Sequence, residues 1–276
     1  MPCAGILSPI LFSMIGLASL VTSVIACEDC LDYATDPVEP IVGTLDVTDD
    51  PFDVAVRGDR VYMVANNSRF PDDPVVHELL VVDVSDPAAP IQLGVLDSPW
   101  GHFSIDVEGD MVYACSPALA KIDVSNPQAP EQLGYFDFAE LPRDIPQTVD
   151  VEAPYAYIIT DVIGSNEGRL RVFDVSGDAP LYRGFLGITD GLNDLVTRWP
   201  YVYAIGSNEF WVVDVSDPTD PIAVGNLTLE FLGTDIALRE DVAVVSVSQR
   251  PSVVIDISSP TAPALLGDGP SMGQFE

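Results

Sequence analysis

The chain has 276 residues, of which 47% are hydrophobic, and its formal net charge is −32 from 11 basic and 43 acidic residues. Such a chain can bury a sizeable core, so wholesale disorder is excluded. Its acidic surface repels nucleic acids and anionic membranes, whose binding depends on Lys and Arg. We therefore expect no nucleic-acid partner. The acidity either attracts cations and basic partners or serves solubility in a salty medium.

The first 26 residues predict a secretory signal peptide. No charged residue occurs between Gly5 and Ala26, apolar residues dominate, and the segment ends on a cleavage-like Val-Ile-Ala. Residues 24–27 also resemble a bacterial lipobox, in which case Cys27 becomes the lipidated first residue. The apolar run is long for a signal, so an uncleaved anchor is a third possibility. We expect an exported protein at the cell surface or outside the cell, touching membrane only through this N-terminal lipid or anchor.

A short motif recurs further along the chain. An Asp followed by Val or Ile and then Ser occurs at Asp83, Asp123, Asp174, Asp214 and Asp256. The spacing is roughly forty residues with one insertion, which suits a repeated unit of about four short strands. The Asp, Ser and Pro residues that follow each strand predict a turn, so the motif is structural.

Each unit consists of short segments rich in Val, Ile and Tyr, separated by Gly, Asp and Pro, which predicts strands. The third segment, such as residues 80–84, is apolar on both faces and must be covered on both sides. Small sheets that neighbouring copies cover in this way form a β-propeller. We predict an all-β fold, with a linker at 27–39, a β-propeller of four-stranded blades at 40–267 and a C-terminal tail at 268–276.

The number of blades follows from counting the copies. The inner three strands occur five times and the outer strand six times, which favours five blades. Either residues 40–47 or residues 264–267 would then close the last blade, and the other would be a surplus edge strand. An incomplete ring of six or seven blades is the alternative.

The repeated strand also resembles a known family. The tetrapeptides LVVD, RVFD, WVVD and VVID end at Asp83, Asp174, Asp214 and Asp256. With the turn that follows each of them, they resemble the LVIVD repeat. The resemblance covers residues 38–267 and implies an exported, surface-associated β-propeller, mostly of bacterial origin. It implies no catalytic signature.

Three insertions, at residues 66–78, 138–147 and 161–168, fall on connections that share one rim of a propeller. Because binding residues concentrate on variable loops of rigid scaffolds, we expect this rim to carry function; neutral drift of loop length is the alternative. The predicted ligand-binding residues of the rim are Phe70, Asp72, Asp73, Trp100 and His102.

Oxygen-bearing side chains also align near the start of the first strand of each unit, at Asp53, Ser104, Thr148, Asp194 and Asp235. These strands line the channel, and a hard cation such as Ca²⁺ prefers carboxylates and hydroxyls. The alternative is that each side chain caps a turn or binds the backbone of a neighbouring blade. Two positions later Asp106 and Asp150 break an apolar pattern, and Lys121 is a candidate ion-pair partner for either.

No nucleophile, metalloprotease or phosphate-binding motif is present. We therefore predict a non-enzymatic binding module whose partner is a protein or glycan. The alternative is a Ca²⁺-dependent hydrolase or lyase with its site at the channel mouth.

Overall fold

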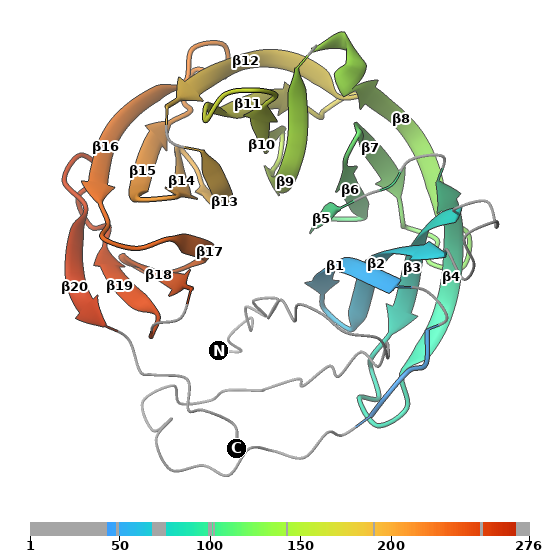
Figure 1. Ribbon diagram of the computed structural model, residues 1–276. Coiled ribbons are helices and arrows are strands. Elements are labelled where there is room, and N and C mark those ends of the chain that lie inside the picture. Colours follow the sequence, from blue (N-terminus) through green and yellow to red (C-terminus); the bar gives the residue numbers. More distant parts are fainter. Residues whose placement is uncertain are drawn as a thin grey trace.

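The computed structural model describes residues 43–47, 50–67, 76–98, 101, 103–141, 143–189, 191–248 and 251–268. Within them, twenty strands form five separate four-stranded antiparallel sheets, as predicted. Figure 1 shows the sheets following one another around a central channel, each with its first strand innermost and its fourth strand outermost. The protein is a β-propeller with five blades.

Each blade takes its four strands in chain order. The first blade contains β1 (Asp50–Arg57), β2 (Arg60–Asn67), β3 (Val76–Asp83) and β4 (Ile91–Ser98). The second contains β5 (Ser104–Glu108), β6 (Met111–Cys115), β7 (Ala118–Asp123) and β8 (Glu131–Asp137). A single turn of 3-10 helix, η1 (Phe138–Glu140), leads to the third, with β9 (Asp144–Glu152), β10 (Tyr155–Val162), β11 (Gly168–Asp174) and β12 (Leu181–Ile188).

The fourth blade contains β13 (Leu192–Arg198), β14 (Tyr201–Gly206), β15 (Glu209–Asp214) and β16 (Ile222–Thr228). The fifth contains β17 (Gly233–Arg239), β18 (Val242–Val247), β19 (Val253–Asp256) and β20 (Ala264–Asp268). Among the described residues, no helix is long and apolar enough to cross a membrane.

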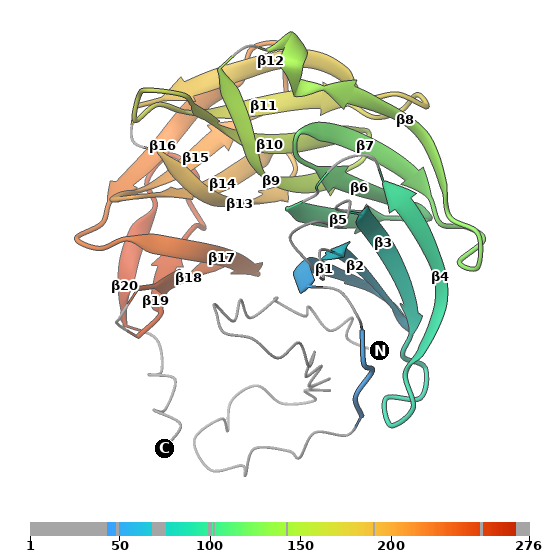
Figure 2. The same ribbon diagram turned by 45° about the vertical axis from the view of Figure 1, so that its right-hand side comes forward.

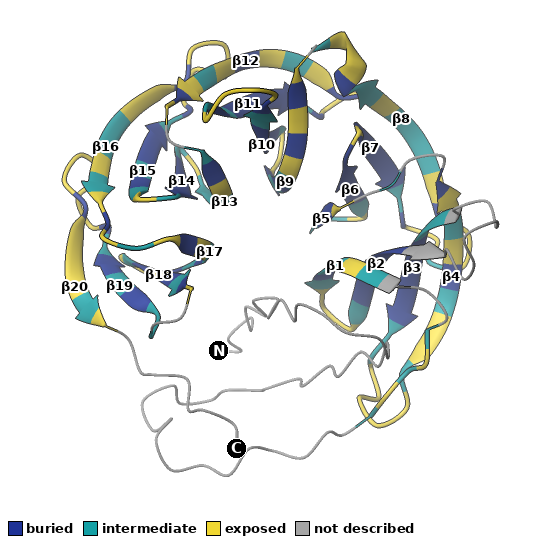
Figure 3. Ribbon diagram, viewed as in Figure 1, coloured by how far each residue is buried: buried dark blue, intermediate teal, exposed yellow. Residues whose placement is uncertain are grey.

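The hydrophobic core lies between the blades. Figure 3 shows buried residues concentrated on the middle strands, whereas the outer strands are mostly exposed or half-buried. The second strand of each of the first four blades carries a tyrosine at the same place, and all four are at most 3% exposed: Tyr62, Tyr113, Tyr157 and Tyr203. In the last blade Val244 takes this position and is 38% exposed. The same tyrosine thus packs between blades in the first four blades, and the fifth blade has no counterpart of it.

The recurrent turn performs the structural role predicted for it. In every copy the carboxylate of the Asp accepts a hydrogen bond from the backbone N–H of the Ser two residues later, as from Ser85 to Asp83 at 2.8 Å. In the first four blades the glycine of the outer strand lies against the turn of the next blade. A Cβ atom added to Gly94 would lie 2.3 Å from the Pro127 carbonyl oxygen, so only glycine fits.

The surplus outer strand is the N-terminal one. The fifth blade is completed by its own β20, and residues 43–47 lie instead against the first blade. A Cβ on Gly43 would lie 2.0 Å from the Pro87 carbonyl oxygen, the relation that Gly94 has to the next turn. Val47 packs against Met63 and Leu80. This segment therefore occupies the place of the outer strand of a blade that would precede the first.

Of the two predicted closures of the last blade, the one by the C-terminal segment is confirmed, because Ala264–Asp268 forms its fourth strand. Strand β19 pairs with β20 along its whole length, from Val253 opposite Asp268 to Asp256 opposite Ala264. No strand edge is left inside the fifth blade for residues 43–47. Figures 1 and 2 show the described ribbon open between β1–β4 and β17–β20.

Candidate functional site at the channel mouth

The five aligned side chains lie on the innermost strands β1, β5, β9, β13 and β17, where the sequence placed them. Three of them bind the backbone of the following blade. The Asp53 carboxylate accepts the N–H of Ile105 at 2.9 Å, and the Ser104 hydroxyl accepts that of Val149 at 3.2 Å. Asp194 accepts the N–H of Ile236 at 3.0 Å. These contacts agree with the alternative to a cation site, in which the aligned side chains bind the backbone of a neighbouring blade.

The hydroxyl groups connect the column further. The Ser104 and Thr148 hydroxyl oxygens lie 3.3 Å apart, and Thr148 donates to the Asp194 carboxylate at 3.5 Å. Among the described residues, no three His, Cys, Asp or Glu side chains lie close enough together to hold a metal ion. A cation at Asp53, Asp194 and Asp235 would therefore depend on the two hydroxyls, and this site stays a prediction.

A second row of contacts runs deeper in the channel. The Asp106 carboxylate accepts the N–H of Val151 at 2.7 Å, and Asp150 accepts the N–H of Thr197 at 2.5 Å. The two acids that break the apolar pattern thus join the second blade to the third and the third to the fourth. A buried carboxylate satisfied in this way can tolerate its low-dielectric surroundings.

Lys121 does not pair with either acid, which corrects the sequence-based hypothesis. Its ammonium group donates to the carbonyl oxygens of Val175 at 2.7 Å and Gly177 at 2.8 Å, in the turn of the next blade. Lys121 is 7% exposed and lies on β7, the third strand of its blade, whereas Asp106 and Asp150 belong to innermost strands. Its side chain therefore meets the turn after β11 before it can reach the channel.

Burial perturbs the acids of the channel. Desolvation raises the pKa of Asp53 from 3.8 to about 6, and desolvation with the charge of Asp106 raises that of Asp150 to about 7. The pKa of Asp194 is also raised, first by burial and then by the neighbouring Asp235. Perturbed acids are candidates for proton transfer, although structural networks shift pKa values in the same way. Here their oxygens already serve inter-blade hydrogen bonds.

A ring of exposed residues surrounds this column at the mouth of the channel. In four blades the first strand has a β-bulge directly before the aligned oxygen-bearing residue, and in the second blade the equivalent residue precedes the strand. All five bulge-position residues are exposed. We call this set the collar: Phe52, Phe103, Gln147, Asn193 and Thr234.

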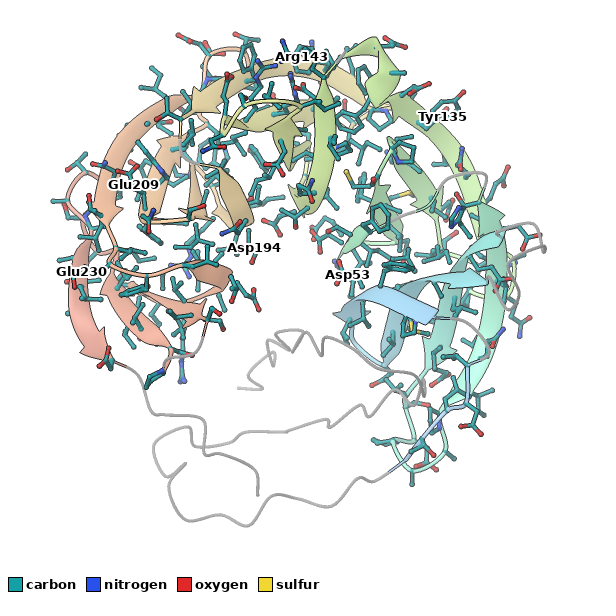
Figure 4. All side chains as sticks on the ribbon, viewed as in Figure 1. Asp53, Tyr135, Arg143, Asp194, Glu209 and Glu230 are labelled. Atoms are coloured by element: carbon teal, nitrogen blue, oxygen red, sulfur yellow. The ribbon has the colours of Figure 1, made fainter. Side chains whose placement is uncertain are left out.

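The collar has an aromatic side and a polar side. The rings of Phe52 and Phe103 come from neighbouring blades and meet edge to face, with centroids 5.2 Å apart. They are 39% and 52% exposed. On the polar side the Asn193 amide donates to the Gly233 carbonyl at 2.7 Å. Figure 4 labels Asp53 and Asp194, the neighbours of Phe52 and Asn193 in the chain, beside the channel.

The rim that bears the collar also carries the insertions. The ends of β2, β10 and β14 and the connections between blades all lie there, because these strands run antiparallel to the innermost strands. We call it the long-loop rim. Arg143 and Ile163 connect two of its insertions: the Ile163 N–H donates to the Arg143 carbonyl, and the Arg143 guanidinium donates to the Ile163 carbonyl, both at 2.7 Å. The insertions of the third blade are thus bound to one another.

Below this rim lies a charged network that the sequence analysis missed. Arg171, 3% exposed, pairs with the fully buried carboxylate of Asp144, which also accepts from Arg169 at 3.1 Å. The Arg171 guanidinium stacks over the rings of Tyr182 and Phe185. The network ties the start of β9 to β11. The signal was present, because an arginine stands in RVFD where the other copies have an apolar residue.

Several predicted residues lie outside the described part of the chain. They include all of the ligand-binding residues predicted for the rim, Phe70, Asp72, Asp73, Trp100 and His102. The signal segment 1–26, the linker 27–39 and Cys27 lie outside it as well. Of the residues proposed for the site, the structure places only the oxygen-bearing column. It adds the collar, which the sequence analysis did not identify.

Comparison with known proteins supports the class of fold. The family model of the LVIVD repeat matches residues 72–97, 200–228 and 233–268, which lie in the first, fourth and fifth blades. No curated protein matches the chain in sequence.

Solved structures similar to this propeller include two bacterial proteins. A structural-genomics protein from Lactobacillus plantarum has a TM-score of 0.65 at 14% identity, covering 82% of this chain and 73% of its own. A protein of Desulfotomaculum acetoxidans, described as functionally unknown, has a TM-score of 0.64 at 11% identity, covering 83% of this chain and 72% of its own. At these identities the likeness shows the fold.

Proposed function

We propose that this protein is an exported or surface-anchored binding module that engages a protein or glycan through its long-loop rim and has no enzymatic activity. The observation that carries the proposal is the contrast between channel and rim. Asp53, Asp106, Asp150 and Asp194 have carboxylate oxygens that accept backbone hydrogen bonds from the next blade. The collar, by contrast, presents exposed side chains on bulges, which redirect side chains and are frequent beside functional sites.

Export and attachment are inferred from the N-terminal segment. The apolar residues up to Ala26 and the lipobox-like sequence ending at Cys27 support secretion or lipidation. The net charge of −32 suits a soluble head that does not itself adhere to anionic lipid. Membrane contact would then occur only through the N-terminal lipid or anchor.

The experiment removes part of the rim and keeps the blades. Residues 163–166, at the tip of the β10–β11 connection, are replaced by Gly-Asn in one variant. In the matched control Ile91 and Leu181, which are 61% and 54% exposed on the opposite rim, are changed to Ser. In cross-linking on intact cells, the rim variant should no longer be cross-linked to partners that the wild type captures, whereas the control variant should still capture them. Retention by the rim variant, or equal loss by the control, contradicts the proposal.

The second candidate is a Ca²⁺-dependent hydrolase or lyase. It is favoured by the convergence of Asp194 and Asp235, whose proximity raises the pKa of the Asp194 carboxyl. Thermal melting with and without CaCl₂ tests it, because a ligand bound to the folded state alone raises the melting temperature. A rise that Asp194→Asn abolishes would establish the cation site. A melting temperature that does not change with Ca²⁺ would contradict this second candidate and favour the binding module.

A further inference from the structure

The collar combines two exposed aromatic rings with an acidic surrounding. Phe52 and Phe103 are the bulge-position residues of adjacent blades, and their edge-to-face contact leaves large parts of both rings exposed. An aromatic face attracts a Lys ammonium or Arg guanidinium group, most strongly where water is partly excluded. The other three collar residues carry amide or hydroxyl oxygens, which can accept hydrogen bonds from such a cation.

The charge of the long-loop rim also favours a cationic ligand. Strand direction places many acidic residues of the described chain on this rim, among them Asp97, Glu140, Asp161, Glu167, Glu209 and Glu230. Two arginines of the described chain lie there as well, and both are engaged. Arg143 donates to the Ile163 carbonyl, and Arg169 pairs with Asp144 and Glu167. The described part of the rim therefore carries more acidic than basic side chains.

We propose that the collar takes a cationic segment of a partner protein, with a Lys or Arg side chain seated against the Phe52–Phe103 pair at the channel mouth. This inference rests on the proposed binding function of the rim and adds the chemistry of the partner. Electrostatic attraction by the whole acidic molecule speeds encounter, and the aromatic pair gives the contact its position.

Neutral glycans fit the same surface less well. A glycan would use the rings as an apolar platform and the amides as hydrogen-bonding groups, but it would gain nothing from the acidic rim. The net charge of −32 and the acidic residues named on this rim favour a cation. The experiment separates the two.

Calorimetric titration of the purified full chain uses three probes: a blocked tetra-arginine peptide, a blocked tetra-glutamine peptide and cellotetraose. The test variant is Phe52→Ala with Phe103→Ala, and a second variant changes both to Leu, which keeps apolar volume and removes the aromatic face. The control is Tyr135→Ala. Tyr135 is 47% exposed on β8, at the outer circumference in Figure 4.

Tetra-arginine should bind the wild type, and both double variants should bind it about five- to thirtyfold more weakly at low salt, as expected for two exposed cation–π contacts. The Tyr135 variant should match the wild type. Unchanged tetra-arginine affinity in the double variants overturns the proposal, since the cation would then be held by acidic surface elsewhere. Equal binding of tetra-glutamine, or cellotetraose binding that requires the Phe pair, overturns it as well.

These outcomes are independent of the test of the binding function. If rim shortening abolishes cross-linking but the Phe variants bind tetra-arginine normally, the rim binds a partner and only its cationic chemistry is wrong. If rim shortening changes nothing, the binding function itself fails.

Discussion

The stability of this protein should rise on acidification from pH 8 to pH 5, and Asp53 should account for a measurable part of the rise. The folded-state pKa of its carboxyl is about 6, against an ordinary value of 3.8. Between these values the folded protein holds a proton that the unfolded chain releases. Protons therefore favour the folded state, and this contribution is full below 3.8 and lost as the pH rises through about 6.

The magnitude follows from the shift. Roughly 2 pH units at about 1.4 kcal/mol each give about 3 kcal/mol in total. About half of this, roughly 1.4 kcal/mol, is developed between pH 8 and pH 5. In that interval ordinary exposed carboxylates stay ionised in both states, so they contribute little.

Urea unfolding at pH 5, 6, 7 and 8 measures the effect in the wild type and in Asp53→Asn. The variant should gain about 1.4 kcal/mol less than the wild type on going from pH 8 to pH 5, whatever its absolute stability. The control is Asp83→Asn. Hydrogen bonds from Ser85 lower the pKa of Asp83, so this acid is ionised across the interval. An identical pH dependence in the wild type and Asp53→Asn would refute the reasoning.

Three further predictions concern the joints between blades, and urea unfolding at pH 7 measures each. Gly94→Ala should lose about 1–3 kcal/mol because the new methyl group overlaps the next turn, whereas Gly177→Ala, whose Cβ meets nothing closer than 3.8 Å, should change little. Lys121→Met should cost about 1–3 kcal/mol by leaving two carbonyl oxygens without their ammonium donor; an unchanged midpoint would show that water replaces it. Asp144→Asn should cost about 3–5 kcal/mol by leaving the buried Arg171 charge unpaired, and the partly exposed Glu167→Gln less than about 1 kcal/mol. Similar losses in the last two variants would contradict the assignment of the network.

The residues that the sequence assigned correctly are those whose role is repeated. Short strands rich in Val, Ile and Tyr and the Asp-Val-Ser turn recur in every blade, so each copy supports the same interpretation. Local periodicity decides these features, because strand pleating and turn geometry depend on a few neighbouring residues. The sequence also placed the oxygen-bearing column on the innermost strands, since equivalent positions in a repeat occupy equivalent places.

Features that occur once, or that depend on pairing register, required the structure. Lys121 binds the next turn and not the channel acids, because its position on the third strand decides which groups its side chain can reach. The collar arises because a bulge adds one residue to the first strand and turns Phe52 outward, and no composition signal marks a bulge. The relation of residues 43–47 to the first blade was likewise undecided, since two segments had the same outer-strand character.

The sequence by itself therefore determined the class of fold, the number of blades and the rim to inspect, because these depend on repeated local chemistry. Tertiary structure alone decided which carboxylates are committed to joining blades and which side chains are left exposed around the channel. The reason is that hydrogen bonds between blades, such as that from Ile105 to Asp53, join residues about fifty positions apart. Their geometry is set by how whole sheets pack, which no local pattern encodes.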